Sequence, residues 1–122
     1  MAKKIMVVDD EKNLLELLEG VLEQAGFAVV TVSDGKECLQ KLKTVKPDLI
    51  LLDMMMPGMS GREVCEKIRA DPKTRDLKVA FLTVARFSET GKDTLKKMKV
   101  LDYITKPFDN DDLVRRVRKM VA

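Results

Sequence analysis

Histidine and tryptophan are absent from the 122 residues, and only five side chains are aromatic, one Tyr and four Phe. Without histidine, the chain cannot use histidine-based acid–base catalysis, form most zinc sites, or carry a phosphohistidine. No apolar run approaches the ~20 residues of a membrane span. The first residues enter a predicted strand almost at once, which leaves no room for a signal peptide, so we expect no association with a membrane.

Cysteine is also scarce, with Cys38 and Cys65 isolated in separate helix-like segments. We expect them to be small core residues of a reduced, cytoplasmic protein rather than a disulfide or a metal pair. The formal net charge is +3, and the positive residues are spread along the sequence. Because no basic stripe is interleaved with aromatic residues, direct nucleic-acid binding by this domain is not expected.

What the sequence does contain is a regular alternation of short apolar runs and helix-like segments over one domain, residues 1–122. Strands are predicted over 4–8, 27–32, 49–52, 79–82 and 101–104. The chain is predicted to turn sharply after Asp53, where Pro57, Gly58 and Gly61 follow. Helices are predicted from 13 to 25, closed by Gly26; after the turn at 33–35, with Leu42 and Val45 on the inner face; from about 61 to 70; over 88–98; and from 110 onward, capped by Asp109 or Asn110. Such alternation predicts an α/β fold: a doubly wound, five-stranded parallel sheet of order 2-1-3-4-5, the flavodoxin-like (βα)5 topology.

Chemically complementary residues follow four of the five predicted strands. Asp9 and Asp10 follow the first, Asp53 the third, Thr83 the fourth and Lys106 the fifth. In this strand order they converge at the carboxyl edge of the sheet, where open α/β sheets place their chemistry. Close carboxylates repel by about 4 kcal/mol per pair at an effective dielectric near 20, so they require a cation, a raised pKa, or both.

Mg²⁺ fits this set, because it binds one or two carboxylates and completes its shell with waters and phosphate oxygens. A hydroxyl and a lysine beside it suit a phosphoryl group. Each residue also has a plainer reading. Asp53 could simply end a strand, Asp9 and Asp10 could favour a helix dipole, and Thr83 and Lys106 could be ordinary strand and surface residues.

Four motifs together resemble the receiver domain of two-component response regulators, in particular the single-domain chemotaxis regulators. They are Ile5–Glu11 (IMVVDDE), Pro47–Gly61 (PDLILLDMMMPGMSG), Phe81–Thr83 (FLT) and Asp102–Phe108 (DYITKPF). The resemblance implies that Asp53 is the phosphorylated residue. It further implies that Mg²⁺, with Mn²⁺ as a substitute, is held by Asp9, Asp10, Asp53 and the Met55 backbone carbonyl. Thr83 and Lys106 would bind the phosphoryl oxygens, and Thr83 and Tyr103 would form a switch. The Lys106–Pro107 peptide would be cis.

The function implied is that of a signalling switch rather than a turnover enzyme, apart from its own phosphorylation and dephosphorylation. The phosphoryl group would come from a sensor histidine kinase or a histidine phosphotransfer protein. The surface of the fourth helix, fifth strand and fifth helix would then control a downstream protein or effector domain. A stand-alone regulator and a fragment of a longer one both remain open.

Two stretches depart from the common family pattern. Val84 stands where Ala or Gly is usual, and we expect its bulk to slow uptake from small phosphodonors. The residues from Lys99 to Leu101 stand where Gly-Ala-Asp is usual, so the resemblance does not define the shape of the turn before the fifth strand or of the output surface beside it. The predicted fourth helix is lysine-rich, which suits either a solvated face or an acidic partner; its lysines, with the one following, are Lys92, Lys96, Lys97 and Lys99.

Two other functions compete with the switch. A metal-dependent phosphohydrolase with an aspartyl nucleophile usually adds a cap or further acids, for which this chain has little room. A flavodoxin-like cofactor binder needs glycine, serine or threonine in its first loop to hold a phosphate, whereas Asp9-Asp10-Glu11 would repel one.

Overall fold

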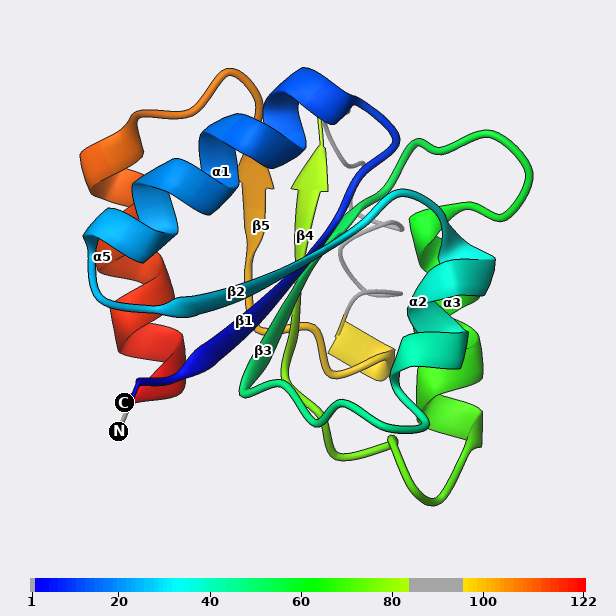
Figure 1. Ribbon diagram of the computed structural model, residues 1–122. Helices are drawn as coiled ribbons and strands as arrows, with labels where there is room; N and C mark the ends of the chain where they lie inside the picture. Colours follow the sequence, from blue (N-terminus) through cyan, green and yellow to red (C-terminus); the bar gives the residue numbers. More distant parts are fainter. Residues whose placement is uncertain (1, 84–95) are drawn as a thin grey trace.

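A computed structural model describes residues 2–83 and 96–122. It contains a five-stranded parallel sheet of order β2-β1-β3-β4-β5 (Figure 1), which confirms the predicted fold. The strands are β1 (Lys4–Val8), β2 (Ala28–Val32), β3 (Leu49–Asp53), β4 (Val79–Thr83) and β5 (Tyr103–Thr105). The helices of the described residues are α1 (Lys12–Gln24), α2 (Gly35–Lys41), α3 (Gly61–Ala70) and α5 (Asn110–Val121).

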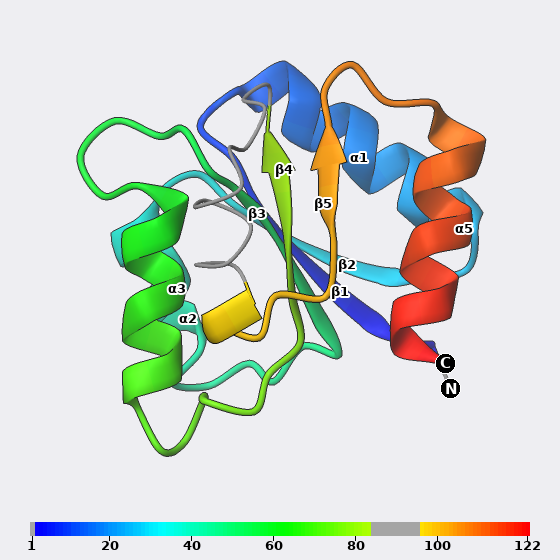
Figure 2. The ribbon, with the colours of Figure 1, turned by 180° about the vertical axis from the view of Figure 1, so that it is seen from behind.

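Helices cover both faces of the sheet, α1 and α5 on one side and α2 and α3 on the other (Figures 1 and 2). Alternate strand residues therefore supply two separate cores, as the pleat requires. In β3, Leu49 and Leu51 pack in the core beneath α1 and α5, and Ile50 and Leu52 pack in the core beneath α2 and α3. Every residue of β3 and β4 is buried, which explains their uninterrupted apolar sequences.

Local sequence explains where three of the described helices begin. The side chains of Asp34, Ser60 and Asp109 accept hydrogen bonds from backbone N–H groups in the first turns of α2, α3 and α5. Of the two caps that the sequence allowed for the last helix, the structure therefore uses Asp109. Gly26, in the left-handed region at φ 99°, follows α1 and ends it as predicted.

Three segments differ from their predicted extents or lie outside the described residues. Helix α2 ends at Lys41, so Leu42 and Val45 follow the helix rather than lie within it. Strand β5 begins at Tyr103 instead of 101, since Lys99 is left-handed at φ 57° and the chain straightens only after this turn. Of the helix predicted over 88–98, residues 88–95 lie outside the described residues, as does Val84; residues 96 and 97 are helical.

Cys38 and Cys65 are buried in the core beneath α2 and α3, and neither forms a disulfide. Burial raises the pKa of the Cys38 thiol to about 12, which keeps it protonated and unreactive. None of the described helices has the length and apolar character that a membrane crossing requires.

Candidate functional site

The carboxyl edge of the sheet is aligned by strand register. Val8 of β1 pairs with Leu52 of β3, so Asp9 and Asp53 each come one residue beyond this pair. At the other side of β3, the backbone N–H of Lys106 donates to the Thr83 carbonyl over 2.8 Å. The sheet thus brings to one edge the residues that its sequence places at the ends of β1, β3, β4 and β5.

The acidic side chains meet in space. Carboxylate oxygens of Asp9, Asp10 and Asp53 all lie within 4.8 Å of one another. Asp9 is 0% exposed and Asp53 3% exposed, whereas Asp10 lies at the surface. The cluster is therefore open to solvent on the Asp10 side and closed toward the sheet.

Lys106 supplies the positive charge at this edge. Its Nζ lies 2.7 Å from Asp9 Oδ2 and 3.7 Å from Asp53 Oδ1. The shorter distance is a charge-assisted hydrogen bond with a buried carboxylate, and the longer one is an electrostatic contact without good hydrogen-bond geometry. In this structure Lys106 is thus anchored on Asp9 and adjacent to Asp53. The Lys106–Pro107 peptide is cis.

Backbone N–H groups orient both buried acids. Glu11 N donates to Asp9 Oδ1 over 2.9 Å, and Met55 N donates to Asp53 Oδ1 over 3.1 Å. Asp53 Oδ2 receives no hydrogen bond from the described residues. Asp53 therefore presents one anchored oxygen and one that is available for chemistry.

The surroundings of Asp53 make its carboxylate harder to form than that of a solvated aspartate. Burial, the largest cause, raises the pKa of Asp53 from 3.8 to about 6, and the charges of Asp9 and Asp10 add to the rise. The Met55 N–H and the Lys106 ammonium oppose it. The single lysine does not neutralise the cluster, so a further cation would stabilise the three carboxylates together.

The donor set fits a hard divalent cation. Mg²⁺ prefers oxygen ligands and uses few protein carboxylates, keeping waters in its remaining positions. Two buried acids with one exposed acid at the rim provide such ligands, and no histidine or thiol competes. Met55, whose carbonyl was the fourth predicted ligand, is in the loop directly after β3, and this residue is 62% exposed.

Two glycines shape the loop beyond Asp53 in different ways, although the sequence suggested a turn at both. Gly58 is left-handed at φ 77° and makes the turn. Gly61, the first residue of α3, instead allows close packing: a Cβ there would lie 2.1 Å from the Asp53 carbonyl oxygen. Sequence reasoning missed this role, because a close backbone approach leaves no local pattern. The Ser60–Glu63 cap that begins α3 was detectable as a capping box.

Thr83 and Tyr103 lie on neighbouring strands. Thr83 is fully buried at the carboxyl end of β4, and it pairs in register with Thr105. Tyr103, at the start of β5, pairs with Phe81 and is half-buried. Thr83 therefore lies at the edge that holds the acids, whereas Tyr103 lies two residues further back along the sheet.

Comparison with known proteins gives a consistent result. The family model for the response regulator receiver domain matches residues 5–118. The chain is 40% identical over 121 residues to the alkaline phosphatase synthesis transcriptional regulatory protein PhoP of Bacillus subtilis, covering 99% of this chain and 49% of that protein. It thus spans about half the length of this curated relative.

Solved structures of similar proteins share the fold. Chemotaxis protein CheY4 of Vibrio cholerae superposes with a TM-score of 0.90 at 27% identity, covering 98% of this chain and 99% of that one. Response regulator TrrA of Thermotoga maritima, in complex with Mg²⁺–BeF, gives 0.81 at 37% identity, covering 97% and 98%. With the family model matching nearly the whole chain, this protein belongs to the response regulator receiver domains of two-component systems, which are signalling switches phosphorylated on aspartate.

Proposed function

We propose that this chain accepts a phosphoryl group from a partner's phosphohistidine onto Asp53. The supporting observation is the gathering of Asp9, Asp10 and Asp53 within 4.8 Å beside the Lys106 ammonium. An anionic nucleophile, a place for a divalent ion and a lysine together meet the requirements of phosphoryl transfer, in which positioning and charge stabilisation dominate.

The chemistry assigns a role to each residue. An Asp53 oxygen attacks phosphorus, a new P–O bond forms, the P–N bond to the partner's histidine breaks, and the nitrogen leaves with the bonding electron pair. Asp9, Asp10, Asp53 and the Met55 carbonyl would hold Mg²⁺, or Mn²⁺ as a substitute, and the ion would supply charge neutralisation for the phosphoryl oxygens. The Lys106 ammonium neutralises charge on a further phosphoryl oxygen, and the Thr83 hydroxyl donates a hydrogen bond to a phosphoryl oxygen.

The product then acts as a switch. An acyl phosphate has more charge and more acceptor oxygens than a carboxylate, so contacts from Thr83 and Lys106 stabilise the state in which both close on it. Tyr103 turns inward as Thr83 moves. The output surface comprises the helix predicted over 88–98 together with β5 and α5, and it controls a downstream protein or an effector domain. The donor is a sensor histidine kinase or a histidine phosphotransfer protein.

Acid-labile labelling with acetyl phosphate tests the proposal directly. We expect Mg²⁺-dependent labelling of the wild-type chain and its complete loss in Asp53→Asn, which preserves shape while removing the nucleophile. The matched control is Asp48→Asn, an exposed acid at the opposite end of β3, which should label as wild type. Labelling of Asp53→Asn at the wild-type level, or labelling unaffected by EDTA, would show that another residue or mechanism is responsible.

Sustained release of phosphate from an external ester tests the competing phosphohydrolase. We expect stoichiometric labelling without such turnover, because among the described residues Asp9 and Asp10 are the only acids that join Asp53 in a carboxylate cluster, and both are assigned to the metal.

A further inference from the structure

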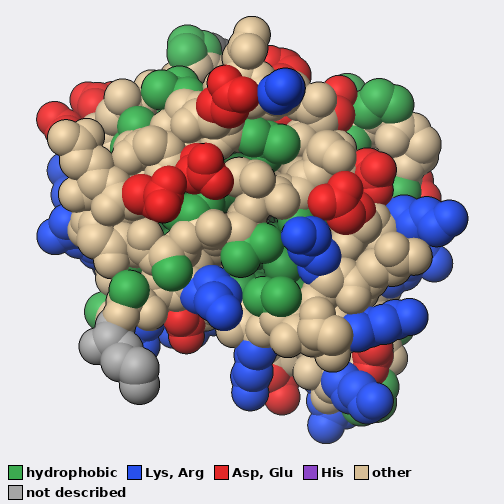
Figure 3. Space-filling view, in the orientation of Figure 1, with side chains coloured by type: hydrophobic (Ala, Val, Ile, Leu, Met, Phe, Trp, Pro, Cys, Tyr) green, Lys and Arg blue, Asp and Glu red, His purple; other side chains and the backbone are tan. Residues whose placement is uncertain are grey.

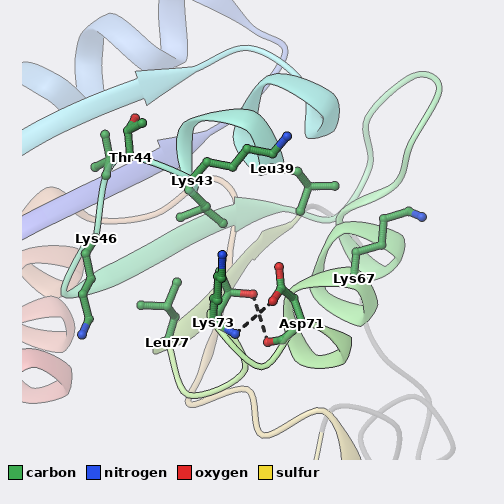
Figure 4. A pocket seen from close by; sticks show the side chains of 11 residues that line it. Leu39, Lys43, Thr44, Lys46, Lys67, Asp71, Lys73 and Leu77 are labelled. Carbon is green, nitrogen blue, oxygen red and sulfur yellow. Dashed lines mark hydrogen bonds between the residues drawn. The ribbon is translucent and has the colours of Figure 1, made fainter.

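A groove of about 640 Å³ lies at the opposite end of the sheet from Asp53, between the segment that leads into β3 and the one that leads into β4 (Figure 4). Its walls come from the end of α2 and the residues after it, from Lys67 of α3, and from the loop after α3. No residue of the acidic site lines it, so the proposed phosphoryl chemistry does not account for it.

The floor of the groove is apolar. Four side chains pack with one flank against the core beneath α2 and α3 and remain half-buried: Leu39, Leu42, Val45 and Leu77. Because each leaves apolar surface accessible from the groove, a ligand that covers them gains about 25 cal/mol for each Å² buried.

The rim of the groove is basic. Four lysines from separate parts of the sequence surround it, and in Figure 4 their ammonium groups end on different sides of the opening: Lys43, Lys46, Lys67 and Lys73. None of them has an ion pair within the described part of the chain. The space-filling view likewise shows Lys and Arg gathered at the lower right, over α2 and α3 (Figure 3).

The groove concentrates the positive charge of the molecule. Asp71 is the one acid among its lining residues, so four lysines leave a net charge of +3. This equals the formal net charge of the whole chain, so the positive and negative charges of the remaining residues cancel. Asp71 is also partly engaged, since its Oδ1 accepts the Lys73 backbone N–H over 2.9 Å.

The loop that forms one wall is held in place before any ligand arrives. Thr74 Oγ1 donates to the Ile68 carbonyl over 2.7 Å, and Leu77 N donates to the Thr74 carbonyl over 3.0 Å. The Arg69 guanidinium donates to the carbonyls of Arg75 and Leu77 over 2.9 and 2.6 Å. A preformed wall lowers the entropy that binding must overcome.

We propose that this groove docks an acidic segment of a partner protein, with apolar anchor residues set among Asp and Glu. Charge complementarity identifies the ligand: carboxylates would relieve the mutual repulsion of the four lysines while the anchors cover the leucine floor. The lining contains neither an aromatic residue to stack a base nor an arginine to grip a phosphate, so it suits a peptide better than a nucleic acid.

Fluorescence anisotropy with a designed peptide tests the proposal on the unphosphorylated protein, so its outcome is separate from that of the phosphoryl chemistry. The probe is a short fluorescein-labelled peptide with leucines one helical turn apart and glutamates elsewhere. We expect Lys43→Glu/Lys73→Glu to weaken its binding about tenfold or more, because rim attractions become repulsions. The matched control, Lys12→Glu/Lys36→Glu, reverses two exposed lysines away from the groove and should bind within about twofold of wild type.

Two further measurements keep the test decisive. Amide chemical shifts of the wild-type protein should change on peptide addition at residues 39–46 and 67–77. Peptides with lysine in place of glutamate, or serine in place of leucine, should bind weakly. The proposal is overturned if the two double variants bind alike, if the shifts map elsewhere, or if oligodeoxythymidine or phosphatidylglycerol vesicles bind the same lysines more tightly than the peptide does.

Discussion

The two ends of one sheet differ in both charge and burial. At the carboxyl edge, Asp9 and Asp53 are buried and held by backbone N–H groups and one lysine. At the amino edge, Lys43 and Lys73 are exposed around a half-buried apolar floor. Charges removed from water interact strongly and demand fixed partners, whereas exposed charges are screened and interact weakly. The first end suits chemistry, and the second suits reversible contact.

Replacement of Lys106 should produce the largest effect. Lys106→Met leaves Asp9 buried with its Oδ2 unpaired, and losing one partner of a buried pair costs about 3–5 kcal/mol. Urea unfolding in EDTA would measure this loss. Lys78→Met is the matched control, because its Nζ donates to the Met120 carbonyl at an exposed site, and it should cost less than about 1 kcal/mol. Equal losses would mean that burial does not distinguish the two lysines.

A methyl group at Gly61 should have the next largest effect. Gly61→Ala places a Cβ against the backbone of Asp53 and Met54, neither of which can move without displacing the site, and we expect a loss of about 3 kcal/mol. Gly20→Ala, in the interior of α1, has nothing within 4 Å of the new Cβ. It should instead stabilise the protein by about 0.5–1 kcal/mol. Thermal unfolding of the pair would establish whether the loop after β3 is as tightly packed as this contact indicates.

Removal of the Asp53 charge should stabilise the metal-free protein in a pH-dependent way. The folded-state pKa of about 6 exceeds 3.8, so the stability that protonated Asp53 provides is complete below about pH 4 and is lost as the pH rises through about 6. The unfolding free energy of Asp53→Asn should therefore exceed that of wild type by up to about 3 kcal/mol near pH 7, and by little near pH 4. Unfolding curves in EDTA across this range provide the measurement, and a difference independent of pH would contradict the assigned cause.

Neutralisation of the groove lysines should have the smallest effect on stability. Lys43→Gln and Lys73→Gln remove exposed, unpaired charges, so each should change the free energy of unfolding by less than about 0.5 kcal/mol. Any shift should be toward greater stability and should shrink in high salt, because mutual repulsion is relieved. If either variant lowered the free energy of unfolding by more than about 1 kcal/mol, these lysines would contribute to folding stability, and the two ends of the sheet would not differ in the way described.

The acidic site was predictable because it depends on topology. Once alternating apolar runs imply a parallel sheet, the residues after each strand must meet at one edge, as Asp9, Asp53 and Lys106 do. Strand ends are fixed by the apolar runs themselves, so β1 and β3 were located within one residue. Strand β5 was less certain, since its entry depends on the left-handed turn at Lys99, a conformation that lysine does not signal.

The sequence could not reveal contacts made by backbone proximity or by distant segments. Gly61 resembled a turn glycine, although its role is to admit the Asp53 carbonyl. Lysines that seem scattered along the chain gather at the groove only after α2, α3 and the following loop have packed. The pairing of Lys106 with Asp9, at a shorter distance than with Asp53, likewise depends on side-chain geometry that no spacing encodes.

Arg69 links two stretches of chain that are more than twenty residues apart in the sequence. Besides the carbonyls of Arg75 and Leu77, its guanidinium donates to those of Met98 and Lys99 over 2.7 and 3.2 Å. Lysine cannot reproduce this, because a single ammonium lacks the planar fork that reaches several acceptors at once. One side chain thereby joins the loop after α3 to the segment that leads into β5, so a shift of one stretch alone would break hydrogen bonds of Arg69.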